Sequence, residues 1–154
     1  MIELEIYTDK IAESGRRLIR KAYEEARGRN HNQLAPEHIF LSISLIEGPF
    51  FSEVMRSLNL DSQVVKKALE TKLDQRDYLG HGMKISEPLR TLLSNALKHS
   101  REEGRKTIES TDLFYALFTD AHSYPVDLLR RLGADREMVM QKITTRASGD
   151  EEER

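Results

Sequence analysis

Cysteine and tryptophan are both missing from this chain of 154 residues. Without cysteine the protein has no disulfide, no thiolate nucleophile and no cysteine-bound zinc, which suits a reducing cytosol. Apolar runs are short, and none approaches the roughly 18 residues that a membrane-spanning helix needs. The first ten residues carry acidic side chains where a signal peptide would be basic. We therefore expect a cytoplasmic protein with no membrane partner.

An excess of either charge is also absent. The chain has 24 basic and 26 acidic residues, for a net charge of −2, so we expect no nucleic-acid partner bound by bulk positive charge. Hydrophobic residues make up 38% and charged residues 32%, a composition that favours a globular helical fold over disorder. The length suffices for a hydrophobic core without disulfides or metals.

Three catalytic signatures are missing as well. The sequence contains no G-x-x-x-x-G-K-[ST] phosphate loop, no H-E-x-x-H metalloprotease helix and no G-x-S-x-G nucleophile turn. We therefore expect that the chain is not an enzyme, and that it holds no catalytic residue, cofactor or metal of its own.

The sequence contains a gapless internal repeat. When residues 10–69 are aligned with residues 84–143, twelve of the sixty pairs are identical, and conservative pairs such as Ile43/Leu117 fall on apolar positions. The identical pairs are Lys10/Lys84, Ile11/Ile85, Glu13/Glu87, Arg16/Arg90, Leu18/Leu92, Ala22/Ala96, Arg27/Arg101, Phe40/Phe114, Arg56/Arg130, Leu58/Leu132, Asp61/Asp135 and Val65/Val139. Shared packing would preserve such a pattern, so Phe40 and Phe114 are expected at equivalent buried positions.

Each repeat predicts four helices, which gives an all-α fold of two tandem four-helix repeats packed with pseudo-two-fold symmetry. The predicted organisation is an N-terminal arm (1–9), repeat one (10–75), a linker (76–84), repeat two (85–145) and a polar tail (146–154). The alternation of Ile2, Leu4 and Ile6 could be a β-extension, an arm or an added helical turn.

Local signals predict the ends of the helices. In repeat one, Pro36 begins the second helix, Gly48-Pro49 ends it, and Asp61 caps the fourth. In repeat two, the predicted caps are Ser86, Ser110 and Asp135, Pro125 begins the third helix, and Gly104 and Gly133 end helices. Val64 and Met138 are predicted on inner faces.

His31, Glu37 and His38 form the best metal candidate, because two histidines and a carboxylate could bind zinc if the loop folded back. Structural packing of both histidines is the favoured interpretation, since repeat two has Arg105 and Asp112 at those places. Glu37 lies in the first turn of a helix, where the macrodipole stabilises an anion. It is also a candidate exposed carboxylate for a partner's cation or amide.

A family resemblance rests on these residues. The segments Glu24-Glu25-Ala26, His31 and Glu37-His38-Ile39, followed by Leu58 and Asp61, resemble the double Clp N-terminal domain of ClpA-, ClpB- and ClpC-type AAA+ unfoldases. Repeat two is similar through Gly104, Ile108, Ser110, Asp112, Leu113, Leu132-Gly133 and Asp135. The resemblance covers about residues 10–145.

The resemblance implies a non-catalytic domain that captures substrates or adaptors for an ATP-driven unfoldase in protein quality control or regulated proteolysis. Its implied partners are an adaptor protein, unfolded or tagged protein substrates, and the Clp ring in cis. ATP and Mg would then belong to C-terminal modules. A stand-alone Clp-repeat protein that modulates a Clp core is the alternative, and a metal-dependent helical enzyme is a third.

The resemblance also names candidate partner-binding residues. ClpC-like members bind phosphorylated arginine at one pocket per repeat, using a threonine at the start of the first helix and the glutamate of T-E-H. Repeat one keeps Glu37 but has Ala12 and Pro36 at the threonine positions, while repeat two has Ser86, Ser110 and, in place of the glutamate, Thr111. ClpA-like members hold an adaptor through the equivalent of Glu37 and an acidic residue where this chain has Asn32. The partner-binding candidates are thus Ala12, His31, Asn32, Glu37, Ser86, Ser110 and Thr111, and neither phosphoarginine pocket is complete.

Overall fold

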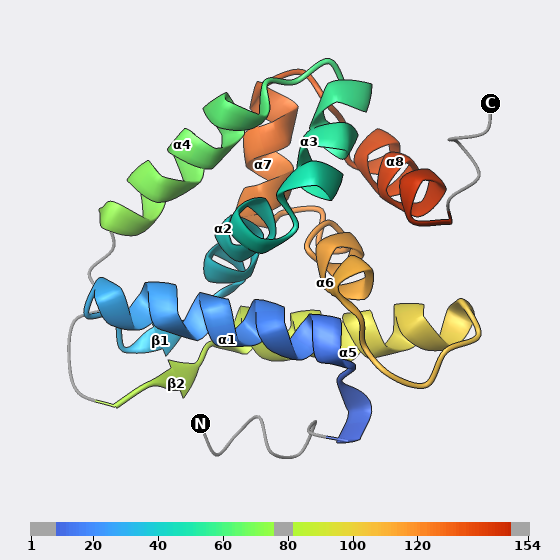
Figure 1. The fold of residues 1–154 in the computed structure, drawn as a ribbon. Coiled ribbons are helices and arrows are strands. Elements are labelled where there is room, and N and C mark those ends of the chain that lie inside the picture. The colour runs from blue at the N-terminus through green and yellow to red at the C-terminus, as the bar shows by residue number, and fades with distance from the viewer. Residues whose placement is uncertain (1–8, 76–81, 149–154) are drawn as a thin grey trace.

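The computed structural model describes residues 9–75 and 82–148, and within them the fold is all-α (Figure 1). The helices are α1 (Glu13–Gly28), α2 (Pro36–Ile46), α3 (Gly48–Ser57), α4 (Ser62–Asp74), α5 (Glu87–Glu102), α6 (Ser110–Ala116), α7 (Tyr124–Arg131) and α8 (Arg136–Ser148). Two short strands, β1 (Gln33–Leu34) and β2 (Lys84–Ile85), complete the described elements. The predicted division into four helices per repeat is confirmed.

The helices are arranged in two tiers around a central pair. α1 and α5 run across one end of the molecule, and α3, α4, α7 and α8 form the other end, with α2 and α6 between them (Figure 1). α1 packs against α2 and α5 packs against α6, while α2 and α6 also contact each other. α2 and α6 therefore join the two repeats at the centre of the core, and α3 and α8 also pack together across the repeats.

Most of the predicted helix boundaries are confirmed. α2 begins at Pro36, Asp61 accepts a hydrogen bond from the Gln63 amide at 2.9 Å, and Ser86 accepts one from the Leu89 amide at 3.2 Å. Asp135 likewise accepts from the Met138 amide at 2.9 Å. Gly104 follows α5 with a φ of +82°, a backbone conformation that suits glycine at a helix end.

Three boundaries differ from the prediction. Gly48 and Pro49 begin α3 instead of ending α2, because proline fits the first turn of a helix, where its missing N–H leaves no partner unbonded. The residue that caps α6 is Glu109, and Ser110 is already helical. α8 continues to Ser148, past the predicted start of the polar tail at residue 146.

The predicted inner positions Val64 and Met138 are wrong. Val64 is 48% exposed and Met138 is 45% exposed, although their neighbours Val65 and Val139 are fully buried. Consecutive residues of a helix point about 100° apart, and on these two helices the identical Val65/Val139 pair faces the core. Residues 1–8, 76–81 and 149–154, including the possible β-extension at Ile2, Leu4 and Ile6, lie outside the described residues.

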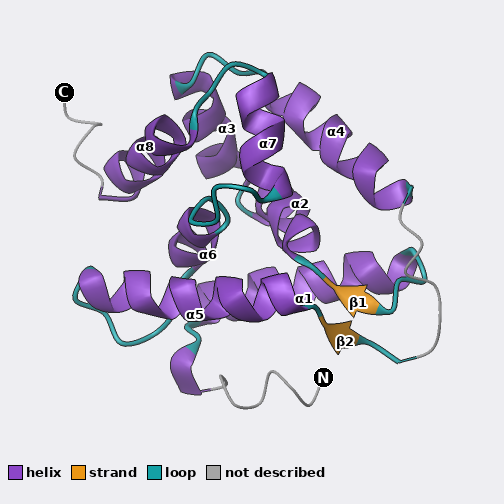
Figure 2. Cartoon of the chain, turned by 180° about the vertical axis from the view of Figure 1, so that it is seen from behind, coloured by secondary structure: helices purple, strands orange, loops and turns teal. Residues whose placement is uncertain are grey.

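The strands were not predicted, and they join the repeats. β1 and β2 lie side by side (Figure 2) and pair in parallel, with Leu34 opposite Ile85. An isolated parallel bridge also joins Ile11 to Ile108. The two repeats are offset by 74 positions, so Ile11 corresponds to Ile85 and Leu34 corresponds to Ile108. The two pairings are therefore the same contact made twice, each between the segment before the first helix of one repeat and the segment before the second helix of the other.

Phenylalanine rings fill the centre of the core where the repeats meet. Phe40 of α2 and Phe114 of α6 are 0% and 1% exposed, and their ring centroids lie 6.2 Å apart. Phe51 and Phe118 pack edge-on against Phe40 at centroid distances of 6.1 Å and 5.7 Å, which is the arrangement that aromatic rings prefer. The expectation of equivalent buried positions for Phe40 and Phe114 is confirmed.

Truncating this core should show the two repeats as one cooperative unit. Phe40→Ala and Phe114→Ala should each lower the free energy of unfolding by about 3–5 kcal/mol, since each leaves a cavity in a fully buried cluster. Leu45→Ala, at a residue that is 37% exposed, serves as the control and should have a much smaller effect. Urea denaturation followed by circular dichroism measures all three, and a loss below about 1 kcal/mol at either phenylalanine would contradict the packing.

The bridge at Ile108 leaves no room for a side chain at Gly15. A Cβ there would lie 2.6 Å from the Ile108 carbonyl oxygen, whereas a Cβ at Gly28 would meet nothing within 4 Å. Both glycines are helical residues of α1, so Gly28→Ala should stabilise the protein by up to about 1 kcal/mol. Gly15→Ala should instead destabilise it. Thermal denaturation of the two variants tests the close approach. A higher melting temperature for Gly15→Ala than for the wild type would contradict it.

Candidate functional site

The structure gathers candidate residues into two groups, and both repeats contribute to each group. In the first group, the Ala12 amide donates to the Ile108 carbonyl at 2.8 Å, and the Ser110 amide donates to Ser14 Oγ at 3.0 Å. The start of α1 therefore lies against the start of α6, which carries Thr111. We name this group, made of Ala12, Ser14, Ser110 and Thr111, the α1/α6 junction.

The second group is its counterpart. The Ser86 amide donates to the Leu34 carbonyl at 3.0 Å, and the Lys84 amide donates to the Asn32 carbonyl at 3.0 Å. The start of α5 therefore lies against the segment that leads into α2 and Glu37. We name this group, made of Asn32, Glu37, Ser86 and the neighbouring His31, the α2/α5 junction.

The pairing of helix starts differs from the arrangement expected within single repeats. α1 and α2 pack together, but α1 is about 24 Å long at 1.5 Å per residue, so its start lies far from the start of α2. Backbone pairing instead joins each first helix to the second helix of the other repeat. Ala12 thus shares a junction with Thr111, and Ser86 shares one with Glu37.

Glu37 is not the exposed carboxylate that the sequence suggested. The residue is 7% exposed in the first turn of α2, where the helix dipole stabilises its charge. Its field reaches Tyr124 at the start of α7: burial raises the pKa of the Tyr124 phenol, Arg131 opposes that rise, and Glu37 adds to it. Glu37 on α2 is thus coupled electrostatically to Tyr124 on α7. Its role as a partner contact stays a prediction.

His31 and His38 form a buried hydrogen-bonded pair. His38 is fully buried and His31 is 5% exposed, and His31 Nδ1 lies 2.9 Å from His38 Nε2. The Ala35 amide donates to His38 Nδ1 at 3.0 Å, so the proton of His38 is on Nε2 and is donated to His31. Both rings are then uncharged. Across the described residues, no three His, Asp or Glu side chains gather where they could hold a metal ion.

Repeat two builds the same connection from charged residues. Arg105 and Asp112 replace the two histidines and form an ion pair. The Glu109 amide donates to Asp112 Oδ2 at 2.8 Å, as the Ala35 amide does to His38. The Arg105 amide bonds to the Ser100 carbonyl at 2.9 Å, just as the His31 amide bonds to the Ala26 carbonyl at 2.9 Å. Each pair thus ties the end of a first helix to the start of a second helix, which supports a structural role for His31 and His38.

Exchanging these pairs tests that role. His31→Arg alone brings two hydrogen-bond donors together at a buried place and should lower the free energy of unfolding by about 1–3 kcal/mol. Adding His38→Asp restores an acceptor and should recover at least half of the loss. A double-mutant cycle by urea denaturation measures the coupling between the two changes. Strict additivity of the two substitutions would contradict a shared connection.

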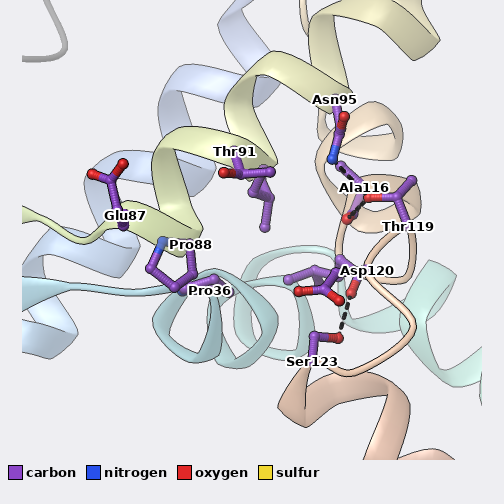
Figure 3. A pocket seen from close by; sticks show the side chains of 11 residues that line it. Pro36, Glu87, Pro88, Thr91, Asn95, Ala116, Thr119, Asp120 and Ser123 are labelled. Carbon is purple, nitrogen blue, oxygen red and sulfur yellow. Dashed lines mark hydrogen bonds between the residues drawn. The ribbon is translucent and has the colours of Figure 1, made fainter.

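A pocket of about 280 Å³ opens beside the α2/α5 junction (Figure 3). Its walls come from α5, the start of α2 and the turn between α6 and α7. The lining residues are Pro36, Glu87, Pro88, Thr91, Leu92, Asn95, Ala116, Leu117, Thr119, Asp120 and Ser123. This pocket was not predicted from the sequence. A usable signal was the pair Pro36 and Pro88, which stand in the first turns of α2 and α5.

The pocket arises from a difference between the repeats. α2 extends to Ile46, whereas α6 ends at Ala116, four residues before the equivalent position, Asp120. From Leu117 onward the chain makes shorter-range turns, in which the Phe118 and Thr119 amides bond to carbonyls three residues earlier. The second helix of repeat two thus ends early, and residues that follow it line the pocket opposite α5.

Comparisons with known proteins agree with this geometry. Residues 10–132 match the family model described as the Clp repeat (R) N-terminal domain. The Hsp104 N-terminal domain from Candida albicans superposes with a TM-score of 0.76 and 14% identity, covering 87% of this chain and 89% of that one. The N-domain of ClpV from Vibrio cholerae gives 0.72 and 22% identity over 92% and 87% of the two chains.

The N-terminal domain of the ClpV1 ATPase from an Escherichia coli type VI secretion system gives a TM-score of 0.72 at 20% identity, covering 92% of this chain and 88% of that one. At these identities the superpositions show a shared fold. No helix in the described ranges has the length and apolar character needed to cross a membrane.

Proposed function

The chain belongs to the Clp repeat N-terminal domain family, and we propose on that basis that it is a protein-binding domain of a Clp-type ATP-dependent unfoldase. Its task would be to capture unfolded or tagged protein segments, or an adaptor that carries them, and to present them to a Clp ring in cis. The work would serve protein quality control or regulated proteolysis in the cytoplasm. ATP and Mg would act in modules outside these residues.

The family match across both repeats is the observation that carries this proposal. Two solved relatives add to it: one structure is a complex of a ClpV N-domain with a VipB peptide, and another includes a peptide from the SciI protein of a type VI secretion system. Peptide capture by such a fold needs exposed pockets on a rigid scaffold. The pocket beside the α2/α5 junction, held by two packed helices and a hydrogen-bonded turn, has that character.

An array of 13-residue peptides that tile several unfolded model proteins tests the proposal directly. The purified chain should bind a reproducible subset of spots, and soluble versions of the best peptides should bind in fluorescence-anisotropy titrations with micromolar to sub-millimolar dissociation constants. A heat-inactivated sample of the chain serves as the control for non-specific adsorption. Failure of every selected peptide to bind in solution would contradict a peptide-capturing role.

A further inference from the structure

We propose that the pocket lined by α5 and the α6–α7 turn takes one aliphatic side chain, such as leucine or methionine, from a partner segment that carries a lysine or arginine beside it. This specificity rests on the proposed protein-binding function, which it makes more definite.

The size of the pocket suits a side chain. Its volume of about 280 Å³ lies just below the roughly 300–1,000 Å³ typical of sites for small molecules and cofactors. Pro36, Pro88, Leu92, Ala116 and Leu117 supply apolar atoms to its walls. One large aliphatic group fits within such a space and would remove apolar surface from water on both sides.

Polar groups inside the pocket already bond to one another. Asn95 Nδ2 donates to Thr119 Oγ1 at 3.0 Å, and Thr119 Oγ1 donates to the Ala116 carbonyl at 2.8 Å (Figure 3). Ser123 Oγ donates to the Leu117 carbonyl at 3.2 Å (Figure 3). A polar ligand group would lose its water partners there without equivalent replacements, whereas an apolar group has none to lose.

The rim of the pocket is acidic. Glu87 and Asp120 are exposed carboxylates on opposite walls, and the lining contains no lysine, arginine or histidine. Glu87 pairs with Arg90 along α5, and Asp120 Oδ1 accepts from the His122 amide at 2.9 Å. Each carboxylate can accept further hydrogen bonds. A cation next to the inserted side chain would therefore meet favourable charge at the rim.

The equivalent place in repeat one keeps a carboxylate, Glu13, at the position of Glu87 but differs along the wall formed by the first helix. Thr91 and Asn95 correspond to Arg17 and Lys21 on α1, so two cations stand where the pocket has neutral side chains. α2 also keeps the helical turn that α6 lacks. The specificity is therefore assigned to one side of the molecule, although the two halves share a fold.

Two variants with matched positions test the assignment. Thr91→Trp places a large side chain on an exposed residue that lines the pocket and should fill it. Arg17→Trp makes the same change at the equivalent exposed residue of repeat one and serves as the control. The probes are four acetylated, amidated peptides with the cores Gly-Ser-Leu-Lys-Ser-Gly, Gly-Ser-Ala-Lys-Ser-Gly, Gly-Ser-Leu-Glu-Ser-Gly and Gly-Ser-Leu-Gln-Ser-Gly.

Amide chemical shifts from ¹H–¹⁵N NMR titrations locate binding and measure affinity. The Leu-Lys peptide should shift amides of Thr91, Asn95 and Thr119, and it should bind at least tenfold more tightly than the Ala-Lys and Leu-Glu peptides. Thr91→Trp should weaken binding of the Leu-Lys peptide at least tenfold, while the Arg17→Trp variant should bind it as tightly as the wild type does. Shifts confined to other surfaces, or equal affinity for both variants, would overturn the assignment.

Charge substitutions give a second, independent readout. Glu87→Gln with Asp120→Asn should reduce the preference for Leu-Lys over Leu-Gln to about twofold or less, because it removes both rim charges while keeping the side-chain size. Circular dichroism confirms that each variant is folded. If peptides selected on the array bind the wild type and the Thr91→Trp variant equally, the assignment of binding to this pocket is wrong and the proposed function stands. If no array peptide or probe binds the wild type, both the pocket assignment and the proposed function are wrong.

Discussion

Backbone pairing between the two repeats is the constraint on which the rest of the structure depends. Each repeat contributes one segment before its first helix and one before its second, and each segment pairs with the other repeat. The Ile11–Ile108 bridge brings α1 to α6, and the β1–β2 pair brings α5 to α2. With these four helix starts fixed in pairs, the phenylalanine cluster between α2 and α6 closes over a single core.

This pairing also decides which candidate residues can act together. Residues that belong to one repeat in the sequence are separated by the length of α1 or α5, while residues from different repeats meet at the two junctions. A pocket that used the start of a first helix and the start of a second would draw on both repeats. The duplication therefore produces two related places on the surface. Their chemistry differs because α2 carries Glu37 where α6 carries Thr111, and because α6 is shorter than α2.

The sequence predicted the parts of the fold that depend on local signals. Helical spacing, the caps at Asp61 and Ser86, and the repeat itself indicated eight helices and the equivalence of Phe40 and Phe114. The strand pairing was not predicted because β1 and β2 have two residues each, which are too few to show an alternating pattern. The burial of Glu37 and the early end of α6 at Ala116 depend on how distant segments pack. Neither could be read from local composition.

The backbone pairing between the two repeats can be tested most directly by native-state hydrogen exchange. The amides of Ala12 and Ser86 donate to Ile108 and Leu34 of the other repeat, so both should open only with the core. We expect their free energies of opening to equal those of core amides in α2 and α6, with the same dependence on denaturant. Opening of either amide at a free energy well below the global value, while the α2 and α6 amides stay protected, would contradict a fold held together by the backbone pairing between the repeats.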